Sequence, residues 1–178
     1  MSTELTNQAF IDAQNLYLGT TNASPSWKVD LKRFRIYLER KYNVSEAYYF
    51  FGIYNSDNTD LYDSIQKAGF ILRFREHSPI MTGKKKGNVD TDVVFTIMEK
   101  LYHKEKFGKV VLVSGDGDYK KLIDFLIKED RLEKVLFPAR KSASSLYRRL
   151  EPSQFDHLDK PALKAKIEYR NRKIAGSP

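Results

Sequence analysis

The chain has 178 residues, 41% of them hydrophobic, which is enough for one substantial core, and its lack of cysteine excludes disulfides and thiolate zinc sites. Its formal net charge of +8 indicates a polyanionic partner such as nucleic acid. Because no apolar run reaches bilayer length and the first residues lack a signal-peptide pattern, we expect a cytoplasmic protein that does not contact membranes.

Segments with strand-like and helix-like patterns alternate along the chain. The predicted strands are residues 9–12, 46–54, 70–76, 109–114 and 134–139. Helical spacing of apolar residues begins at Asp30, Asp60, Val89 and Asp118. This alternation predicts an α/β fold, a Rossmann-like three-layer sandwich with a mainly parallel five-stranded sheet in the order 3-2-1-4-5. Residues 1–160 would form this domain, followed by a basic tail at 161–178.

Acidic side chains follow the strands that this order makes neighbours. "FIDAQNL" places Asp12 at the end of the first strand, and "SGDGD" places Asp116 and Asp118 after the fourth. "KGNVDTDVV" adds Asp90 and Asp92 at the start of a helix. Several carboxylates this close together persist only with shared protons or a bound cation. An all-oxygen set without His or Cys suits Mg²⁺ or Mn²⁺, and hence metal-assisted hydrolysis of phosphodiesters.

Several candidate site residues also have a purely structural interpretation. Asp92 in a first helical turn would complement the helix dipole, and Asp118 would serve as the N-cap of the helix that follows. Asn15, three residues after Asp12, would close an Asx-turn. The three lysines Lys84–Lys86 would form an ordinary solvated loop. For Asp12 no such role is evident, because a carboxylate at the end of an apolar central strand is costly without a partner.

The motifs "FIDAQNL", "KGNVDTDVV", "VLVSGDGDYKKLIDFL" and "ARKSASSLYRRLEPSQFDHLD" together resemble the NYN family, a branch of the PIN-like nucleases that includes the LabA-like proteins. The resemblance implies a PIN-like fold and a metal-dependent endoribonuclease. The implied catalytic residues are Asp12, Asp90, Asp116, Asp118 and Asn15. The same four aspartates, with Asp92 as an addition, are the implied ligands of Mg²⁺ or Mn²⁺.

The resemblance also implies a substrate-binding set around the carboxylates. RNA is the expected partner, with single-stranded DNA as a second substrate, and a homo-oligomer is compatible with the sequence. In the late segment "SSLYRRL", the two serines would cap a helix near a phosphate. Tyr119 stands where the family usually has phenylalanine, a change expected to be harmless. The predicted phosphate-contacting residues are Lys84, Lys85, Lys86, Ser114, Ser144, Ser145, Arg148 and Arg149.

Three other functions compete with the nuclease hypothesis. A phosphohydrolase with an aspartyl-phosphate mechanism requires a second Asp two residues after the first, where this chain has Gln14. A topoisomerase-primase type of site expects Glu in place of Asp12. From a different class, a non-catalytic module would bind RNA or a protein and use the carboxylates for a structural metal ion.

Overall fold

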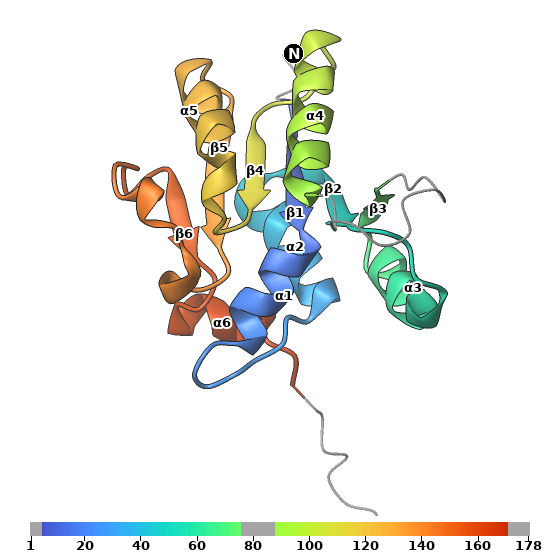
Figure 1. Cartoon of the computed structure of the whole chain (residues 1–178). Coiled ribbons are helices and arrows are strands. Elements are labelled where there is room, and N and C mark those ends of the chain that lie inside the picture. The colour runs from blue at the N-terminus through green and yellow to red at the C-terminus, as the bar shows by residue number, and fades with distance from the viewer. Residues whose placement is uncertain (1–4, 76–87, 171–178) are drawn as a thin grey trace, which may run out of the picture.

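The computed structural model describes residues 5–75 and 88–170 (Figure 1). The strands are β1 (Asn7–Asp12), β2 (Val44–Phe51), β3 (Ile71–Phe74), β4 (Val110–Val113), β5 (Leu132–Phe137) and β6 (Phe155–His157). The helices are α1 (Ala13–Thr21), α2 (Leu31–Tyr42), α3 (Thr59–Lys67), α4 (Val89–Tyr102), α5 (Lys120–Lys128) and α6 (Pro161–Ile167). Short 3₁₀ turns are η1 (Ser56–Asn58), η3 (Gly117–Tyr119), η4 (Arg140–Ser142) and η5 (Ser145–Tyr147).

The strands form one sheet in the order β3-β2-β1-β4-β5-β6, and every neighbouring pair is parallel. The predicted order of the first five strands and the α/β class are therefore confirmed. The predicted number of five strands is wrong, because β6 adds a sixth strand beside β5. Three half-buried residues form β6, too few to show a two-residue periodicity in the sequence.

The centre of the sheet consists of β1 and β4, which pair from Gln8↔Val110 to Ile11↔Val113. All four residues of β4 are fully buried, as are Ala9 and Ile11 of β1. Side chains on both sides of these strands thus contact protein, which explains their nearly unbroken apolar sequence. Because the two strands are parallel and in register, the residues that follow them emerge at the same edge of the sheet.

Helices cover both faces of the sheet. One core contains Ala9 and Ile11 of β1 with buried residues of α1, α2, α3 and α6. The other core contains Phe10 with buried residues of α4 and α5. This alternation along β1 is the two-residue period of a strand between two helical layers. Within the part of the chain that the structure describes, no helix is long and apolar enough to cross a membrane.

Helix α1 follows β1 directly and was not among the predicted helices. Its buried face is made of Ala13, Leu16, Gly19 and Thr20, so it lacks the stripe of large apolar residues that marks a helix in the sequence. The helix is specified instead by its N-cap, because the side chain of Asp12 accepts a hydrogen bond from the backbone N–H of Asn15.

The predicted basic tail begins with packed structure rather than with a separate segment. Helix α6 starts at Pro161 and places Leu163 and Ile167 in the core. Backbone bonds join its end to the segment before α2, from Asp30 N–H to the Ile167 carbonyl (2.7 Å) and from Tyr169 N–H to the Lys28 carbonyl (2.8 Å). The boundary at residue 160 therefore cuts through the packed domain. Residues 171–178 lie outside the described part of the chain.

Candidate metal centre

Asp12 is placed at the junction of β1 and α1, where it is only 5% exposed. One carboxylate oxygen accepts the Asn15 backbone N–H at 3.0 Å, and the other accepts the Tyr119 hydroxyl at 3.2 Å. Burial raises the pKa of Asp12, although these two hydrogen bonds act in the opposite direction. The structural role that the sequence did not reveal for Asp12 is thus the N-cap of α1.

The loop after β4 carries two aspartates separated by glycines, and tight packing explains the glycines. A Cβ atom on Gly115 would lie 2.8 Å from the Ser142 carbonyl oxygen, and one on Gly117 would lie 2.7 Å from Ser144 Oγ. The loop therefore lies against the segment 142–144. This contact fixes the backbone from which Asp116 and Asp118 project.

Within this loop, Asp116 is the N-cap of η3. Its carboxylate accepts the backbone N–H of Asp118 at 3.1 Å, and its own N–H donates to Ser114 Oγ at 3.1 Å. The Tyr147 hydroxyl donates to the Asp116 carbonyl oxygen. The cap predicted for Asp118 is thus supplied by Asp116, and α5 begins at Lys120 without a side-chain cap.

Asp90 lies in the first turn of α4 and is 7% exposed. Its Oδ2 atom is buried and has no hydrogen-bond partner among the described residues. Burial, together with the charges of Asp116 and Asp12, raises the pKa of Asp90 to about 6, while the nearby polar side chains of Tyr119 and Asn88 oppose the shift. A buried carboxylate oxygen without a partner is costly and is the kind of atom that a cation would satisfy.

Asp90, Asp116 and Asp118 form the cluster that fits a divalent cation. Each contributes one carboxylate oxygen, and these oxygens lie within 4.8 Å of one another. Asn88 Nδ2 donates to the Asp118 carboxylate at 3.3 Å. Oxygen ligands alone suit a hard ion such as Mg²⁺ or Mn²⁺, so the residues present fit the ion implied by the sequence.

Two other predicted site residues lie around this cluster. Asp12 is outside the group of three. Its charge nevertheless contributes to the raised pKa of Asp90, and its carboxylate accepts a hydrogen bond from the Tyr119 hydroxyl. Asp92 is also outside the group; it is half-buried, and its Oδ2 has no partner among the described residues.

Asn15 ties α1 to the aspartate loop. Its Oδ1 atom accepts the Gly115 backbone N–H at 2.7 Å, across one hundred residues of sequence. The Asx-turn predicted for Asn15 is not formed by its side chain, because the capping carboxylate is that of Asp12. Asn15 therefore positions the loop that carries Asp116 and Asp118.

The predicted substrate-binding residues are distributed unevenly. Ser114 is 1% exposed and accepts a backbone N–H inside the aspartate loop, so it has a positioning role. Ser144 caps η5, a 3₁₀ turn in place of the predicted late helix, by accepting the Leu146 N–H at 3.3 Å. Ser145, Arg148 and Arg149 are exposed. Lys84, Lys85 and Lys86 lie outside the described residues.

Tyr119 contacts the site through its hydroxyl group, a role that the sequence did not predict. It is fully buried, and its hydroxyl is the group that a phenylalanine at this position would lack. The hydroxyl donates to Asp12, and its pKa is raised by burial and by the charges of Asp12 and Asp90. The signal in the sequence was the tyrosine itself, directly after Asp118.

Comparisons with known proteins agree with this architecture. Residues 8–155 match the NYN domain. No curated protein is significantly similar in sequence. The fold is similar to the crystal structure of a protein of unknown function from Vibrio parahaemolyticus, with a TM-score of 0.73 and 18% sequence identity over 95% of this chain and 99% of that one. Since the NYN match covers most of the sequence, including all the residues of the carboxylate cluster, the chain belongs to the NYN domain family.

Proposed function

We propose that the protein is a metal-dependent endoribonuclease that hydrolyses RNA phosphodiester bonds. The observation that carries this proposal is the cluster of Asp90, Asp116 and Asp118 at the carboxyl edge of the central strands in an NYN domain. NYN domains have a PIN-like nuclease fold and generally act on nucleic acids. A net charge of +8 in a protein with an acidic cluster fits a substrate whose phosphates flank the cleaved bond.

Each residue of the site has a role in this proposal. Asp90, Asp116 and Asp118 would hold Mg²⁺ or Mn²⁺, which supplies an acidified water and neutralises charge on the phosphate. Asp12 and Tyr119 would fix the inner wall of the site. The further substrate contacts proposed are those of Arg148, Arg149, Ser145 and the segment Lys84–Lys86.

The pKa of Asp90 links the site to pH. Near pH 6 its carboxyl group is protonated in a large fraction of molecules without a cation, and it releases this proton when a cation binds. Binding of the ion therefore strengthens as the pH rises through about 6. The rate of cleavage would therefore also rise with pH in this range.

The test is cleavage of labelled single-stranded RNA, structured RNA and single-stranded DNA in Mn²⁺, Mg²⁺ or EDTA. We expect RNA cleavage that depends on the cation and falls by at least 10²-fold in Asp90→Asn and Asp116→Asn, because each removes a charged ligand. Asp63→Asn is the matched control, since Asp63 is an exposed carboxylate on α3. RNA binding without cleavage under all of these conditions would instead indicate a non-catalytic RNA-binding module.

The remaining parts of the proposal concern context. A cytoplasmic location and a homo-oligomeric state are predictions, to be tested by fractionation of cells and by light scattering of the purified protein. Single-stranded DNA is included in the cleavage assay because the groups proposed to bind the substrate contact a metal ion or phosphates, which RNA and DNA share, and not the 2′-hydroxyl group that distinguishes them.

A further inference from the structure

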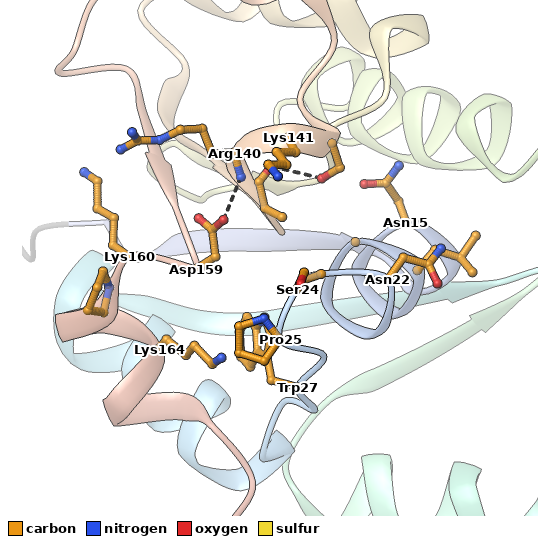
Figure 2. A pocket seen from close by; sticks show the side chains of 16 residues that line it. Asn15, Asn22, Ser24, Pro25, Trp27, Arg140, Lys141, Asp159, Lys160 and Lys164 are labelled. Atoms are coloured by element: carbon orange, nitrogen blue, oxygen red, sulfur yellow. Dashed lines mark hydrogen bonds between the residues drawn. The ribbon is translucent and has the colours of Figure 1, made fainter.

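A hollow lies next to the carboxylate cluster. It is a cavity of about 730 Å³ enclosed by α1 and the loop that follows it, by η4, and by the start of α6 (Figure 2). Its volume falls within the range of pockets that bind small organic ligands. None of the carboxylates of the metal cluster lines it.

The walls of the cavity are held by specific contacts. A Cβ atom on Gly19 would lie 2.5 Å from Pro138 Cβ, so only glycine lets α1 lie this close to the chain before η4. The backbone N–H of Arg140 donates to the Asp159 carboxylate at 3.0 Å, a bond that joins η4 to the chain before α6 (Figure 2). Lys164 Nζ lies 5.2 Å from the centre of the Trp27 ring. The cavity is therefore a built feature of the fold.

The cavity is strongly basic. Four cationic side chains line it, those of Arg140, Lys141, Lys160 and Lys164, against the single carboxylate of Asp159. The two lysines of the α6 region have acidic partners, because Lys160 pairs with Asp156 (2.5 Å) and Lys164 with Glu168 (3.5 Å).

The two cations of η4 differ from these lysines. Arg140 and Lys141 are exposed, and neither side chain makes an ion pair within the described ranges 5–75 and 88–170. Arg140 and Lys141 are adjacent in sequence and both line the cavity. They are the groups that would bind an anion there.

The cavity and the metal cluster share a wall. Asn15 lines the cavity, and its side chain accepts the backbone N–H of Gly115 in the aspartate loop. From the other side, Ser144 N–H donates to the Gly115 carbonyl at 2.9 Å, and Ser144 lies two residues after the cavity residue Ser142. A chain of nucleotides bound at the carboxylates would therefore have a basic hollow beside it.

Apolar surface completes the cavity. Leu18 is 42% exposed although it is a large apolar residue, and Pro25, which also lines the cavity, is exposed. Trp27 is 4% exposed, and its indole N–H has no hydrogen-bond partner among the described residues. The cavity therefore offers apolar surface beside the two cations of η4.

We propose that this cavity is a nucleotide subsite, in which Arg140 and Lys141 hold the phosphate and Leu18 and Pro25 contact the nucleoside. The inference rests on the proposed function, because it assigns the nucleotide to the RNA chain that is cut at the carboxylates. The phosphate belongs either to a terminal monoester or to an internal diester of this chain. Both combine an anionic phosphate with an attached nucleoside, so both fit the cations and the apolar surface of the cavity.

The test is calorimetric titration in EDTA, where no cation bridges phosphate to the carboxylates. The probes are 5′- and 3′-nucleoside monophosphates, the unphosphorylated nucleosides and inorganic phosphate. Trp27 is the sole tryptophan, so its fluorescence reports occupancy in parallel. We expect saturable binding of the monophosphates, weakened about tenfold by Arg140→Gln or Lys141→Gln, the loss of one charge-assisted contact. Lys67→Gln, an exposed cation on α3, is the control and is expected to bind as wild type.

Oligonucleotides then separate the two sources of phosphate. Tighter binding of chains with a terminal phosphate than of chains with terminal hydroxyls assigns the cavity to a chain end, and equal binding that still depends on Arg140 assigns it to an internal phosphate. Equal affinity for inorganic phosphate and nucleotides, or unchanged binding in both η4 variants, would overturn the nucleotide subsite.

The two proposals fail in different ways. Nucleotide binding that persists in a protein unable to cleave RNA contradicts only the endoribonuclease proposal. Cation-dependent cleavage by a protein that binds no nucleotide in the cavity contradicts only the subsite. Melting temperatures of all variants show whether any loss of binding reflects loss of the fold.

Discussion

Asp90 is the residue whose surroundings fit a bound cation most clearly, and its ionised form is unfavourable in the folded protein without one. It is buried, has an oxygen without a partner in the described structure, and lies near two further carboxylates. Burial and like charges both disfavour its ionised form. Without a cation, ionised Asp90 therefore works against folding.

The first prediction concerns the pH dependence of stability in EDTA. The pKa of Asp90 rises from 3.8 to about 6 on folding, so the folded protein binds more protons between these values. The free energy of unfolding should then fall as the pH rises through this window. Asp90→Asn should remove up to ~2 kcal/mol of that fall. Urea unfolding at pH 4.5 and 7 measures it, and identical pH dependence in both proteins would contradict it.

The second prediction concerns the Tyr119 hydroxyl, which donates to Asp12. Tyr119→Phe removes a bond that lowers the pKa of Asp12, so this pKa should rise and the acid limb of the cleavage profile should move to higher pH. Stability should fall by about 1–2 kcal/mol. Tyr147→Phe is the control, because its hydroxyl contacts a backbone carbonyl and not a carboxylate. Superimposable profiles for wild type and Tyr119→Phe would show that the hydroxyl is dispensable.

Among the connecting segments, the aspartate loop depends on how closely it packs against segment 142–144. The third prediction is that Gly117→Ala displaces the loop, because its Cβ would lie 2.7 Å from Ser144 Oγ and 3.0 Å from Leu146 Cδ1. We expect the free energy of unfolding to fall by about 1–3 kcal/mol and Mn²⁺ to bind more weakly. Gly52→Ala is the control, since a Cβ there meets nothing within 4 Å. Calorimetric titration with Mn²⁺ and urea unfolding of both variants measure the effect; equal behaviour would refute it.

The fourth prediction concerns α6, which places Leu163 and Ile167 in the core. A chain that ends at residue 170 should keep the stability of the full protein. A chain that ends at residue 160 should lose about 3–5 kcal/mol, because two buried aliphatic side chains are removed together with their backbone contacts. Thermal melts of the two truncated chains compare them. A stable, unaltered chain ending at residue 160 would mean that α6 contributes nothing to the fold.

The molecule as a whole combines a positive net charge with a cluster of carboxylates. If the protein acts on RNA as proposed, cations outside the carboxylate cluster would neutralise phosphates of the bound chain and release its counterions, whereas the cluster itself would repel RNA unless a cation is bound. Association should therefore depend on salt through the exposed basic residues, and cleavage should depend on the divalent ion through the carboxylates.

The fifth prediction separates these two dependences. Binding of single-stranded RNA to the inactive Asp116→Asn protein should weaken as salt rises. The double variant Arg148→Gln and Arg149→Gln should reduce the slope of log K against log salt by about 1.4, if both arginines contact phosphates. Fluorescence anisotropy between 50 and 300 mM salt, values chosen to span roughly the range in which the slope is measured, gives this slope. An unchanged slope would place both arginines away from the RNA.

Local patterns of the sequence determined the central part of this protein. The apolar runs of β1 and β4 are recognisable because side chains on both faces are buried, and the sheet order brings the residues after them to one edge. Asp116 and Asp118 of the cluster follow from that placement, whereas Asp90 joins them from the first turn of α4. The NYN resemblance was confirmed, and it rests on the same short motifs.

Only the tertiary structure decided the parts that depend on distant contacts. Helix α1 is stabilised by the cap of Asp12 and by a buried face of mostly small residues. Helix α6 is hard to recognise in the sequence because it lies in a basic segment and buries only two side chains. The bonds from Tyr119 to Asp12 and from Asn15 to Gly115 each join residues about a hundred positions apart. No local periodicity encodes such pairs, because they form only when the strands between them have been aligned in the sheet.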